Sequence, residues 1–257
     1  MAGIPLGRFV WYELLTSDPD AAIRFYTKLI GWSTSTWEGM DQPYTMWMNG
    51  ETPIGGVMQL PEDAVTAGAP PHWLAYVSTP DIDDTTKKVS SLGGVVHHLM
   101  EIPTVGKIAI LADPGGAIFA AYTPAGETPG GDGPPEQGQF SWHELLAHDH
   151  EAAFGFYSKL FGWEKTDAFD MGEAGMYQMY GLPGTGIPLG GMFTKPKEIP
   201  APPHWLLYTM VDNVDTRADQ VKQLGGQVLM GPMEVPGGDR IVQCMDKQGA
   251  VFALHSR

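Results

Sequence analysis

The sequence predicts an α+β protein made of four βαβββ units in two tandem modules. The first observation is a long internal repeat: "FVWYELLTSDPDAAIRFYTKLIGW" (9–32) and "FSWHELLAHDHEAAFGFYSKLFGW" (140–163) are identical at 14 of 24 positions. The second is a weaker repeat inside each module, in which a shift of 61 residues places Trp11 on His72. Duplication at two levels predicts four copies of one supersecondary unit.

Each unit is expected to begin with a short strand and a helix. The segment 9–15, "FVWYELL", is rich in the aromatic and β-branched residues that favour strands. Asp18 is suited to cap the following helix, with Pro19 at its first position, where the missing N–H costs nothing. Gly31 can then adopt the left-handed conformation that ends a helix. These signals predict a helix of about three turns.

The second unit shows the same order. We expect Thr79 to cap its helix, Pro80 to start it, and the "LGG" at 92–94 to end it. Short apolar runs follow both helices and predict hairpins. These runs read "YTMWMNG", "TPIGGVMQL", "KIAILAD" and "AIFAAYT".

A proline- and glycine-rich stretch separates the two modules. The segment 124–138 contains "PAGETPGGDGPPEQG", a composition that disfavours both a helix and the interior of a sheet. We therefore expect a first module at 1–123, a linker at 124–138 and a second module at 139–257.

Composition limits the partners and the location. With 15 basic and 30 acidic residues the net charge is −15, which disfavours nucleic acid and anionic membranes as partners. No apolar stretch approaches the roughly 20 residues that span a bilayer. A single cysteine, Cys244, excludes an internal disulfide, and the N-terminus lacks the features of a signal peptide. We expect a cytoplasmic protein, a monomer or homodimer, with a small molecule as its partner.

The repeated motifs resemble those of the vicinal oxygen chelate superfamily, the glyoxalase, bleomycin resistance and extradiol dioxygenase group. They are the helix segment "DPDAAIRFYTKLIGW" (18–32) with its copy, and "DPGGAIFA" (113–120) with its copy "DKQGAVFA" (246–253). The resemblance covers 9–123 and 140–256 and is to tandem two-module, glyoxalase-like members. It implies two curved mixed sheets, each forming a cup. Because such folds carry isomerases, dioxygenases and metal-free binding proteins, it does not by itself imply one activity.

The resemblance also implies where a metal would bind. His72 and His204, from "PPHWLAY" and "PPHWLLY", fall on a ligand position of the superfamily. Metal sites need three or four converging donors. The other matching positions carry residues that cannot serve, namely Trp11, Ala120, Trp142 and Ala253. We therefore predict no bound metal and no other cofactor; if a divalent metal does bind, His72 and His204 would hold it.

Alternation along a strand extends each candidate site. Residues two apart share a face, so Glu13 should lie beside Trp11, and Tyr76 beside His72. An inward carboxylate is costly unless it is paired or solvated, and a glutamate against a histidine would raise the pKa of the imidazole. The catalytic candidates are Glu13, His72, Glu144 and His204. The expected ligand-binding residues are Trp11, Glu13, His72, Tyr76, Trp142, Glu144, His204, Tyr208 and, at the rim of the second cup, His255.

Two functions follow from these residues and stay open at the level of sequence. The first is a protein that binds a small, partly aromatic molecule in one or both cups, as metal-free, bleomycin-resistance-like members do. The second is an enzyme of the glyoxalase or dioxygenase type, a lyase, isomerase or dioxygenase that uses a divalent metal or a Glu/His acid–base pair. The two tryptophans have an equally good interpretation as core aromatics.

Overall fold

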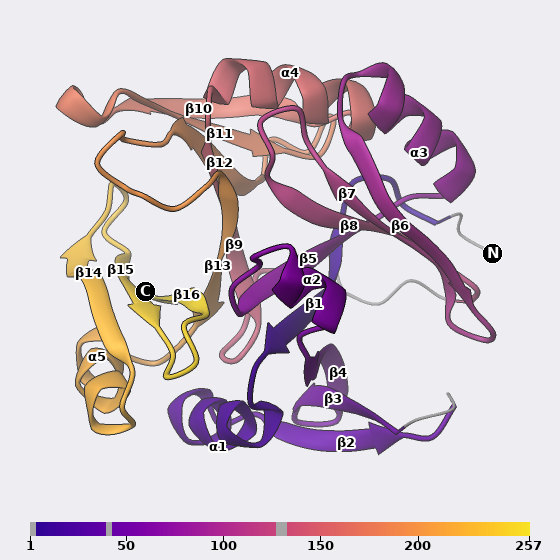
Figure 1. Cartoon of the computed structure of the whole chain (residues 1–257). Helices are drawn as coiled ribbons and strands as arrows, with labels where there is room; N and C mark the ends of the chain where they lie inside the picture. Colours follow the sequence, from indigo (N-terminus) through magenta and orange to yellow (C-terminus); the bar gives the residue numbers. More distant parts are fainter. Residues whose placement is uncertain (1–3, 40–42, 127–132) are drawn as a thin grey trace. The chain divides into compact units, whose positions relative to one another are not determined.

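The computed structural model describes residues 4–39, 43–126 and 133–257 (Figure 1). The order of elements is βαβββ four times over, with one additional short helix, α2, that the sequence did not predict. The first half contains β1 (Phe9–Thr16), α1 (Pro19–Ile30), β2 (Ser33–Trp37), β3 (Tyr44–Asn49), β4 (Thr52–Gln59), α2 (Glu62–Thr66), β5 (His72–Ser78), α3 (Ile82–Ser91), β6 (Val95–Ile102), β7 (Gly106–Ala112) and β8 (Ile118–Pro124).

The second half repeats this order with a short 3-10 turn, η1 (Gly172–Ala174), in place of α2. Its elements are β9 (Phe140–Ala147), α4 (His150–Phe161), β10 (Glu164–Asp170), β11 (Met176–Gly181), β12 (Pro188–Thr194), β13 (His204–Met210), α5 (Val214–Gln223), β14 (Gln227–Glu234), β15 (Arg240–Met245) and β16 (Val251–Ser256).

The strands form two eight-stranded mixed sheets, one in each half of the sequence. Their orders are β2-β3-β4-β1-β5-β8-β7-β6 and β10-β11-β12-β9-β13-β16-β15-β14. The first strand of each unit pairs in parallel with the last, as β1 does with β4 and β5 with β8, while successive strands within a unit form antiparallel hairpins. The predicted α+β class and the four βαβββ units are confirmed.

The ends of the first helix follow the sequence signals. The Asp18 carboxylate accepts a hydrogen bond from the Ala21 N–H at 2.9 Å, and Gly31 ends α1 with φ +97°. The expectation for α3 was wrong in detail, because its cap is Asp81, whose carboxylate accepts from two backbone N–H groups. The Thr79 hydroxyl instead forms a hydrogen bond with that of Thr85 at 2.7 Å and does not serve as the cap.

Close packing pairs the four units crosswise. Among the described residues, one compact unit holds 11–39, 43–74, 133–141 and 206–257 and includes α1 and α5; the other holds 4–10, 75–126 and 142–205 and includes α3 and α4. We call them the α1/α5 unit and the α3/α4 unit. Within each, the two helices contact one another, as Figure 1 shows for α3 and α4. The first βαβββ repeat thus packs mainly with the fourth, and the second with the third.

The tryptophan that follows the first helix of each module fixes this crosswise pairing. In the α1/α5 unit, Trp32 donates its indole N–H to the Gly138 carbonyl at 2.7 Å. In the α3/α4 unit, Trp163 donates to the Gly7 carbonyl at 2.8 Å. Both tryptophans are at most 1% exposed, so each bond satisfies a buried donor that would otherwise be costly. The repeated "GW" therefore ties each helix to the start of the other module.

A second buried hydrogen-bond chain lies behind each helix. Trp73 donates to the Tyr26 hydroxyl at 3.1 Å, which donates to the Asp246 carboxylate at 3.1 Å. The copy in the α3/α4 unit joins Trp205, Tyr157 and Asp113 at 3.3 and 3.2 Å. Burial raises the pKa of both aspartates. Trp73 therefore faces the helix layer.

Part of the predicted linker lies outside the described residues, at 127–132. Of the rest, Pro124 belongs to β8, and the Gln137 carbonyl accepts from the Asn49 amide at 2.9 Å. The module boundaries themselves stay a prediction. Across the described ranges, no helix is both long and apolar enough to cross a membrane.

Candidate functional site

A buried glutamate anchors a hydrogen-bonded chain in the α1/α5 unit. Glu13, on β1, is only 4% exposed, and the Tyr44 hydroxyl on β3 lies 3.0 and 2.8 Å from its two carboxylate oxygens. Trp11 donates its indole N–H to the same hydroxyl at 3.1 Å. Because a carboxylate only accepts, the tyrosine proton points toward Glu13. This chain, which we call the Trp–Tyr–Glu relay, fixes the orientation of all three side chains.

The same relay recurs in the α3/α4 unit. Trp142 donates to the Tyr177 hydroxyl at 2.7 Å, which donates to Glu144 at 2.9 Å. Glu144 is 6% exposed, while Trp142 and Tyr177 are half-buried. Both relays use matching strands: the tryptophan and glutamate lie on β1 or β9, the first strand of a βαβββ repeat, and the tyrosine lies on β3 or β11, the third strand of that repeat. The duplication therefore preserved a polar arrangement that is costly to bury.

A glycine in the neighbouring strand makes room for each relay tyrosine. Gly56 on β4 pairs with Glu13 in the sheet, and a Cβ at this position would collide with the Tyr44 hydroxyl and lie 2.6 Å from Glu13 Oε1. Gly191 on β12 pairs with Glu144, and a Cβ there would collide with the Tyr177 ring. The second glycine of each repeated "GG", at 56 and 191, is thus part of the site, because only glycine leaves space for the relay tyrosine.

The two histidines that the sequence singled out are neutral, and each donates a hydrogen bond to a backbone carbonyl. His72 Nδ1 lies 2.8 Å from the Pro70 carbonyl and His204 Nδ1 lies 2.8 Å from the Pro202 carbonyl. A carbonyl only accepts, so Nδ1 carries the proton and Nε2 keeps its lone pair. Burial lowers the pKa of both imidazoles, which keeps them neutral near pH 7. Nε2 of each ring has no hydrogen-bond partner among the described residues.

The sequence left three partners open for each histidine, namely Glu13 or Glu144, a water, or the ligand, and the pKa of the two rings argues against the glutamates. A carboxylate beside the imidazole would raise the pKa of the histidine, whereas burial lowers the pKa of both His72 and His204. The physical reason is local: the proline pair before each histidine places a carbonyl within reach of Nδ1. The glutamates instead take up the tyrosine hydroxyls, which the sequence argument had not considered. The other part of the expectation, a water or ligand on the histidine, stays a prediction.

Beyond the relays, the remaining expected residues lie in separate contacts. Tyr76 is 8% exposed, with its ring centroid 6.5 Å from that of Tyr122 at an interplanar angle of 81°. Tyr208 accepts a hydrogen bond from the Gln243 amide at 3.0 Å. His255 pairs with Asp239 at 2.9 Å.

Two other side chains of types that often take part in catalysis have structural roles here. His143 stacks on Phe9 with ring centroids 3.7 Å apart, and complete burial lowers its pKa to about 4. It therefore packs in the core. Burial raises the pKa of the Cys244 thiol to about 12, so almost no thiolate forms near pH 7. Neither group is suited to acid–base or nucleophilic chemistry.

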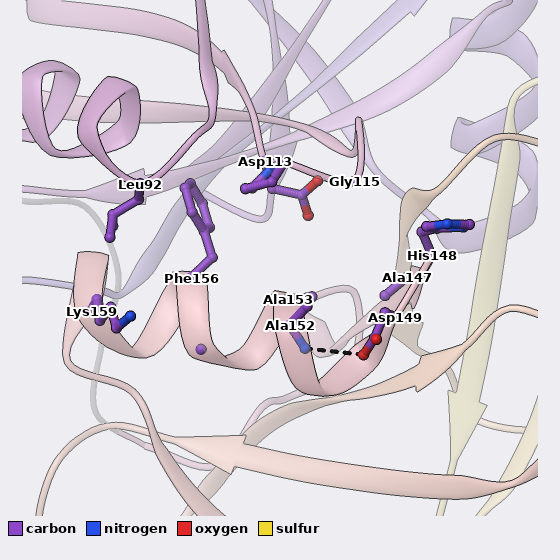
Figure 2. Close-up of a pocket in the computed structure, with 12 residues that line it drawn as sticks. Leu92, Asp113, Gly115, Ala147, His148, Asp149, Ala152, Ala153, Phe156 and Lys159 are labelled. Atoms are coloured by element: carbon purple, nitrogen blue, oxygen red, sulfur yellow. Dashed lines mark hydrogen bonds between the residues drawn. The ribbon is translucent and has the colours of Figure 1, made fainter.

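A cavity of about 450 Å³ lies in the α3/α4 unit, on the helix side (Figure 2). Two of its polar side chains, both aspartates, already hold structural hydrogen bonds, and His148 and Lys159 also line it. Asp149 caps α4, and Asp113 accepts from Tyr157 and the Ala117 N–H. The rest of the lining includes Leu92, Ala152 and Phe156. None of the relay residues lines this cavity, so we do not assign the site to it.

Comparison with known proteins agrees with this geometry. The family described as the Glyoxalase/Bleomycin resistance protein/Dioxygenase superfamily matches residues 8–120 and 139–254. The chain belongs to this superfamily. The resemblance predicted from the repeated motifs is confirmed, and each sheet lies in its matched range except for the end of its last strand, β8 or β16.

Several superfamily relatives align along nearly the whole chain. A Mycobacterium tuberculosis protein named "Putative glyoxylase CFP32" is 31% identical over 248 residues, covering 95% of this chain and 92% of that protein. The "Anthracycline biosynthesis protein DauV" of a Streptomyces species is 28% identical, with 96% and 92% covered. Among solved structures, the Mn(II)-bound glyoxalase from Novosphingobium aromaticivorans has a TM-score of 0.65 at 16% identity, covering 100% of this chain and 83% of that one. At that identity the likeness shows the fold alone.

A metal ion of the kind bound by that glyoxalase does not fit the residues present. Within the ranges that the structure describes, no three His, Cys, Asp or Glu side chains gather into a group that could hold a metal. In the first site, Trp11 supplies an indole N–H, which is not a ligand, and Glu13 is engaged by Tyr44. His72 offers one nitrogen, and a stable site needs at least three donors. We therefore derive no step through a metal.

The sequence argument missed Tyr44 and Tyr177, although a signal for them exists. They open the corresponding segments "YTMW" (44–47) and "YQMY" (177–180), which keep a Y-x-M-aromatic pattern. A polar hydroxyl at the same point of both copies, on a strand beside a double glycine, would have identified the partner that the buried glutamates required.

Proposed function

We propose that the two relay sites bind a small, planar aromatic molecule without a metal ion. The observation that carries this proposal is the duplicated Trp–Tyr–Glu relay, each copy with a neutral histidine in the same unit. In each relay the indole N–H is already bonded to the tyrosine, so the tryptophan can offer a ligand only its ring face. Stacking on such a face suits a flat, apolar ring system.

The polar groups suit a ligand that carries hydroxyl groups. A phenolic hydroxyl can donate to His72 Nε2 or His204 Nε2, since burial keeps both rings neutral. The buried carboxylates of Glu13 and Glu144 hold the tyrosines and are not exposed enough to repel an electron-rich ring. A few fixed polar groups within an aromatic wall are typical of small-molecule sites.

The relatives indicate a class of ligand. The Streptomyces proteins DauV and DnrV, 28% and 27% identical to this chain, are both named anthracycline biosynthesis proteins. Anthracyclines contain a fused ring system with phenolic hydroxyls, which matches the stacking and hydrogen-bonding groups described above. A hydroxyanthraquinone is therefore the probe of choice.

An enzyme of the glyoxalase type is the second candidate. It is favoured by the two histidine Nε2 lone pairs, which could accept a proton, and by the relative named "Putative glyoxylase CFP32". In that reading Glu13, His72, Glu144 and His204 remain the catalytic candidates. The expectations of a cytoplasmic location and of a monomer or homodimer stay predictions.

Titration with alizarin, a dihydroxyanthraquinone, tests the proposed function through tryptophan emission. We expect saturable quenching in the wild type and about tenfold weaker binding for Trp11→Leu and Trp142→Leu at their respective sites, because stacking and buried ring area are lost. Trp37→Leu, on the β2 strand outside either relay, serves as the matched control and should bind as the wild type does. Large losses of thermal stability with unchanged affinity in the relay variants would show that both tryptophans are core residues instead.

A further inference from the structure

A second polar chain, separate from the relays, joins Ser141, His255 and Asp239 in the α1/α5 unit. Ser141 Oγ, at the start of β9, lies 3.0 Å from His255 Nδ1 on β16. The other ring nitrogen, Nε2, lies 2.9 Å from an Asp239 carboxylate oxygen. The His255 side chain is 12% exposed and that of Asp239 is 39% exposed. A serine, a histidine and a carboxylate are therefore in hydrogen-bonding sequence.

The direction of these bonds follows from the groups themselves. An ionised Asp239 only accepts, so His255 Nε2 carries the proton and donates it to the carboxylate. Nδ1 of a neutral ring then has its lone pair toward Ser141. The serine hydroxyl can donate to Nδ1 at 3.0 Å or to the Tyr208 carbonyl at 3.3 Å. In the shorter contact the serine O–H points toward the lone pair of Nδ1, which is the arrangement that activates a hydroxyl nucleophile.

The fold itself does not require this chain. In the first module, Val10 stands at the position that matches Ser141, and Tyr122 at the position that matches His255. The Tyr122 hydroxyl bonds to the Val105 carbonyl at 2.9 Å, so that module is stable with an unrelated arrangement. The second module thus contains a serine, a histidine and a carboxylate in hydrogen-bonding sequence. The first module packs without such a chain, so packing does not explain it.

We propose that Ser141 is a nucleophile toward esters of small carboxylic acids, with His255 as its base and Asp239 as the residue that positions the ring. Ser141 Oγ attacks the acyl carbon while its proton passes to His255 Nδ1. The ester C–O bond breaks and the alcohol leaves with that proton, so an acyl-serine forms. Water then attacks the acyl carbon while one of its protons passes to His255 Nδ1, the bond between the acyl carbon and Ser141 Oγ breaks, and Oγ takes that proton back, so the acid leaves and the free hydroxyl is restored. No oxidant, metal or further reactant is needed, and this activity does not depend on aromatic ligand binding.

Covalent labelling of the full chain with diisopropyl fluorophosphate tests the proposal directly. Here Ser141 Oγ bonds to phosphorus and fluoride leaves. We expect one adduct per chain, mapped by peptide mass spectrometry to Ser141, and no adduct in Ser141→Ala, which should fold because Val10 fills the matching place. His255→Gln should slow labelling about a hundredfold, the usual scale of a general base. Asp239→Asn should slow it less and should shift the pH at which the labelling rate is half-maximal.

The controls separate a reactive site from incidental chemistry. Ser17→Ala alters an exposed serine outside the chain and should label as the wild type does. If His255→Gln does not fold by circular dichroism, Ser141→Cys takes its place, and its thiol should react with iodoacetamide faster than free cysteine at pH 7. The absence of an adduct at Ser141 would overturn the proposal. Equal labelling rates in the wild type and in a folded His255→Gln variant would overturn it as well. Unchanged alizarin binding in Ser141→Ala would leave the proposed function standing apart from this outcome.

Discussion

Replacing Gly56 with alanine should lower the free energy of unfolding by about 2 kcal/mol, the usual scale of overpacking. The added Cβ would collide with the Tyr44 hydroxyl, which is held between Trp11 and Glu13. The tyrosine must leave its place, and Glu13, only 4% exposed, then loses that hydroxyl donor. We also expect at least about tenfold weaker alizarin binding at this site, because the orientation of Trp11 is lost. Chemical denaturation and the tryptophan titration measure the two effects.

The chain provides its own comparisons for this result. Gly191→Ala makes the matching change in the α3/α4 unit, where the Cβ would collide with the Tyr177 ring, and should act on the second site alone. Gly155→Ala, in α4, meets nothing within 4 Å and should be neutral or slightly stabilising, since alanine favours a helix. Wild-type stability and affinity in both Gly56→Ala and Gly191→Ala would show that the relays do not shape the sites.

Asp246→Ala should cost about 3 kcal/mol of unfolding free energy, since buried donors left without acceptors cost about 1–3 kcal/mol each and water can satisfy some of them. Its Oδ1 accepts from the backbone N–H groups of Gln248, Gly249 and Ala250, each at 2.9 Å. Its Oδ2 accepts from Tyr26, which also accepts from Trp73. One carboxylate therefore holds both the turn at 246–250 and the end of the Trp73–Tyr26–Asp246 hydrogen-bond chain behind α1.

Two further variants separate these roles. Asp246→Asn keeps an oxygen for the turn but places an amide against Tyr26, so it should cost less than alanine. Burial disfavours the charge of Asp246 and raises its pKa in the wild-type protein. The neutral asparagine does not bear this cost. Asp113→Ala is the matching change in the α3/α4 unit and should destabilise to a similar degree, as followed by thermal and chemical unfolding. A loss under about 1 kcal/mol in both alanine variants would contradict the structural role given to these chains.

Local signals predicted much of the fold. Asp18, Pro19 and Gly31 act over single bonds and single dihedral angles, so each could be recognised from its neighbours in sequence, and each is where it was expected. The repeat predicted four βαβββ units because every copy must bury the same apolar faces. The error at α3 was also local: Thr79 and Asp81 are both good caps, and the choice depended on the contact of Thr79 with Thr85.

The crosswise packing could not be predicted in the same way. It depends on bonds between distant residues, such as Trp32 with Gly138 and Tyr26 with Asp246, and nothing in either segment identifies its partner. Alternation of side chains correctly placed Trp11 and Glu13 near one another, since both bond to Tyr44. The tyrosine comes from another strand, so only a comparison of the two modules along their full length could have found it.

Calorimetric titration of alizarin into protein dialysed without a chelator, with the metal content of the same sample measured by mass spectrometry, is the most direct test of a metal-free aromatic binding site. We predict that the sample holds far less than one equivalent of Mn, Fe, Ni or Zn per module and binds alizarin fully. Reloading with Mn²⁺ and desalting should leave the affinity unchanged, and His72→Ala and His204→Ala should leave the metal content unchanged. Stoichiometric metal that disappears in either histidine variant, together with binding that requires it, would contradict the proposal and favour the enzyme.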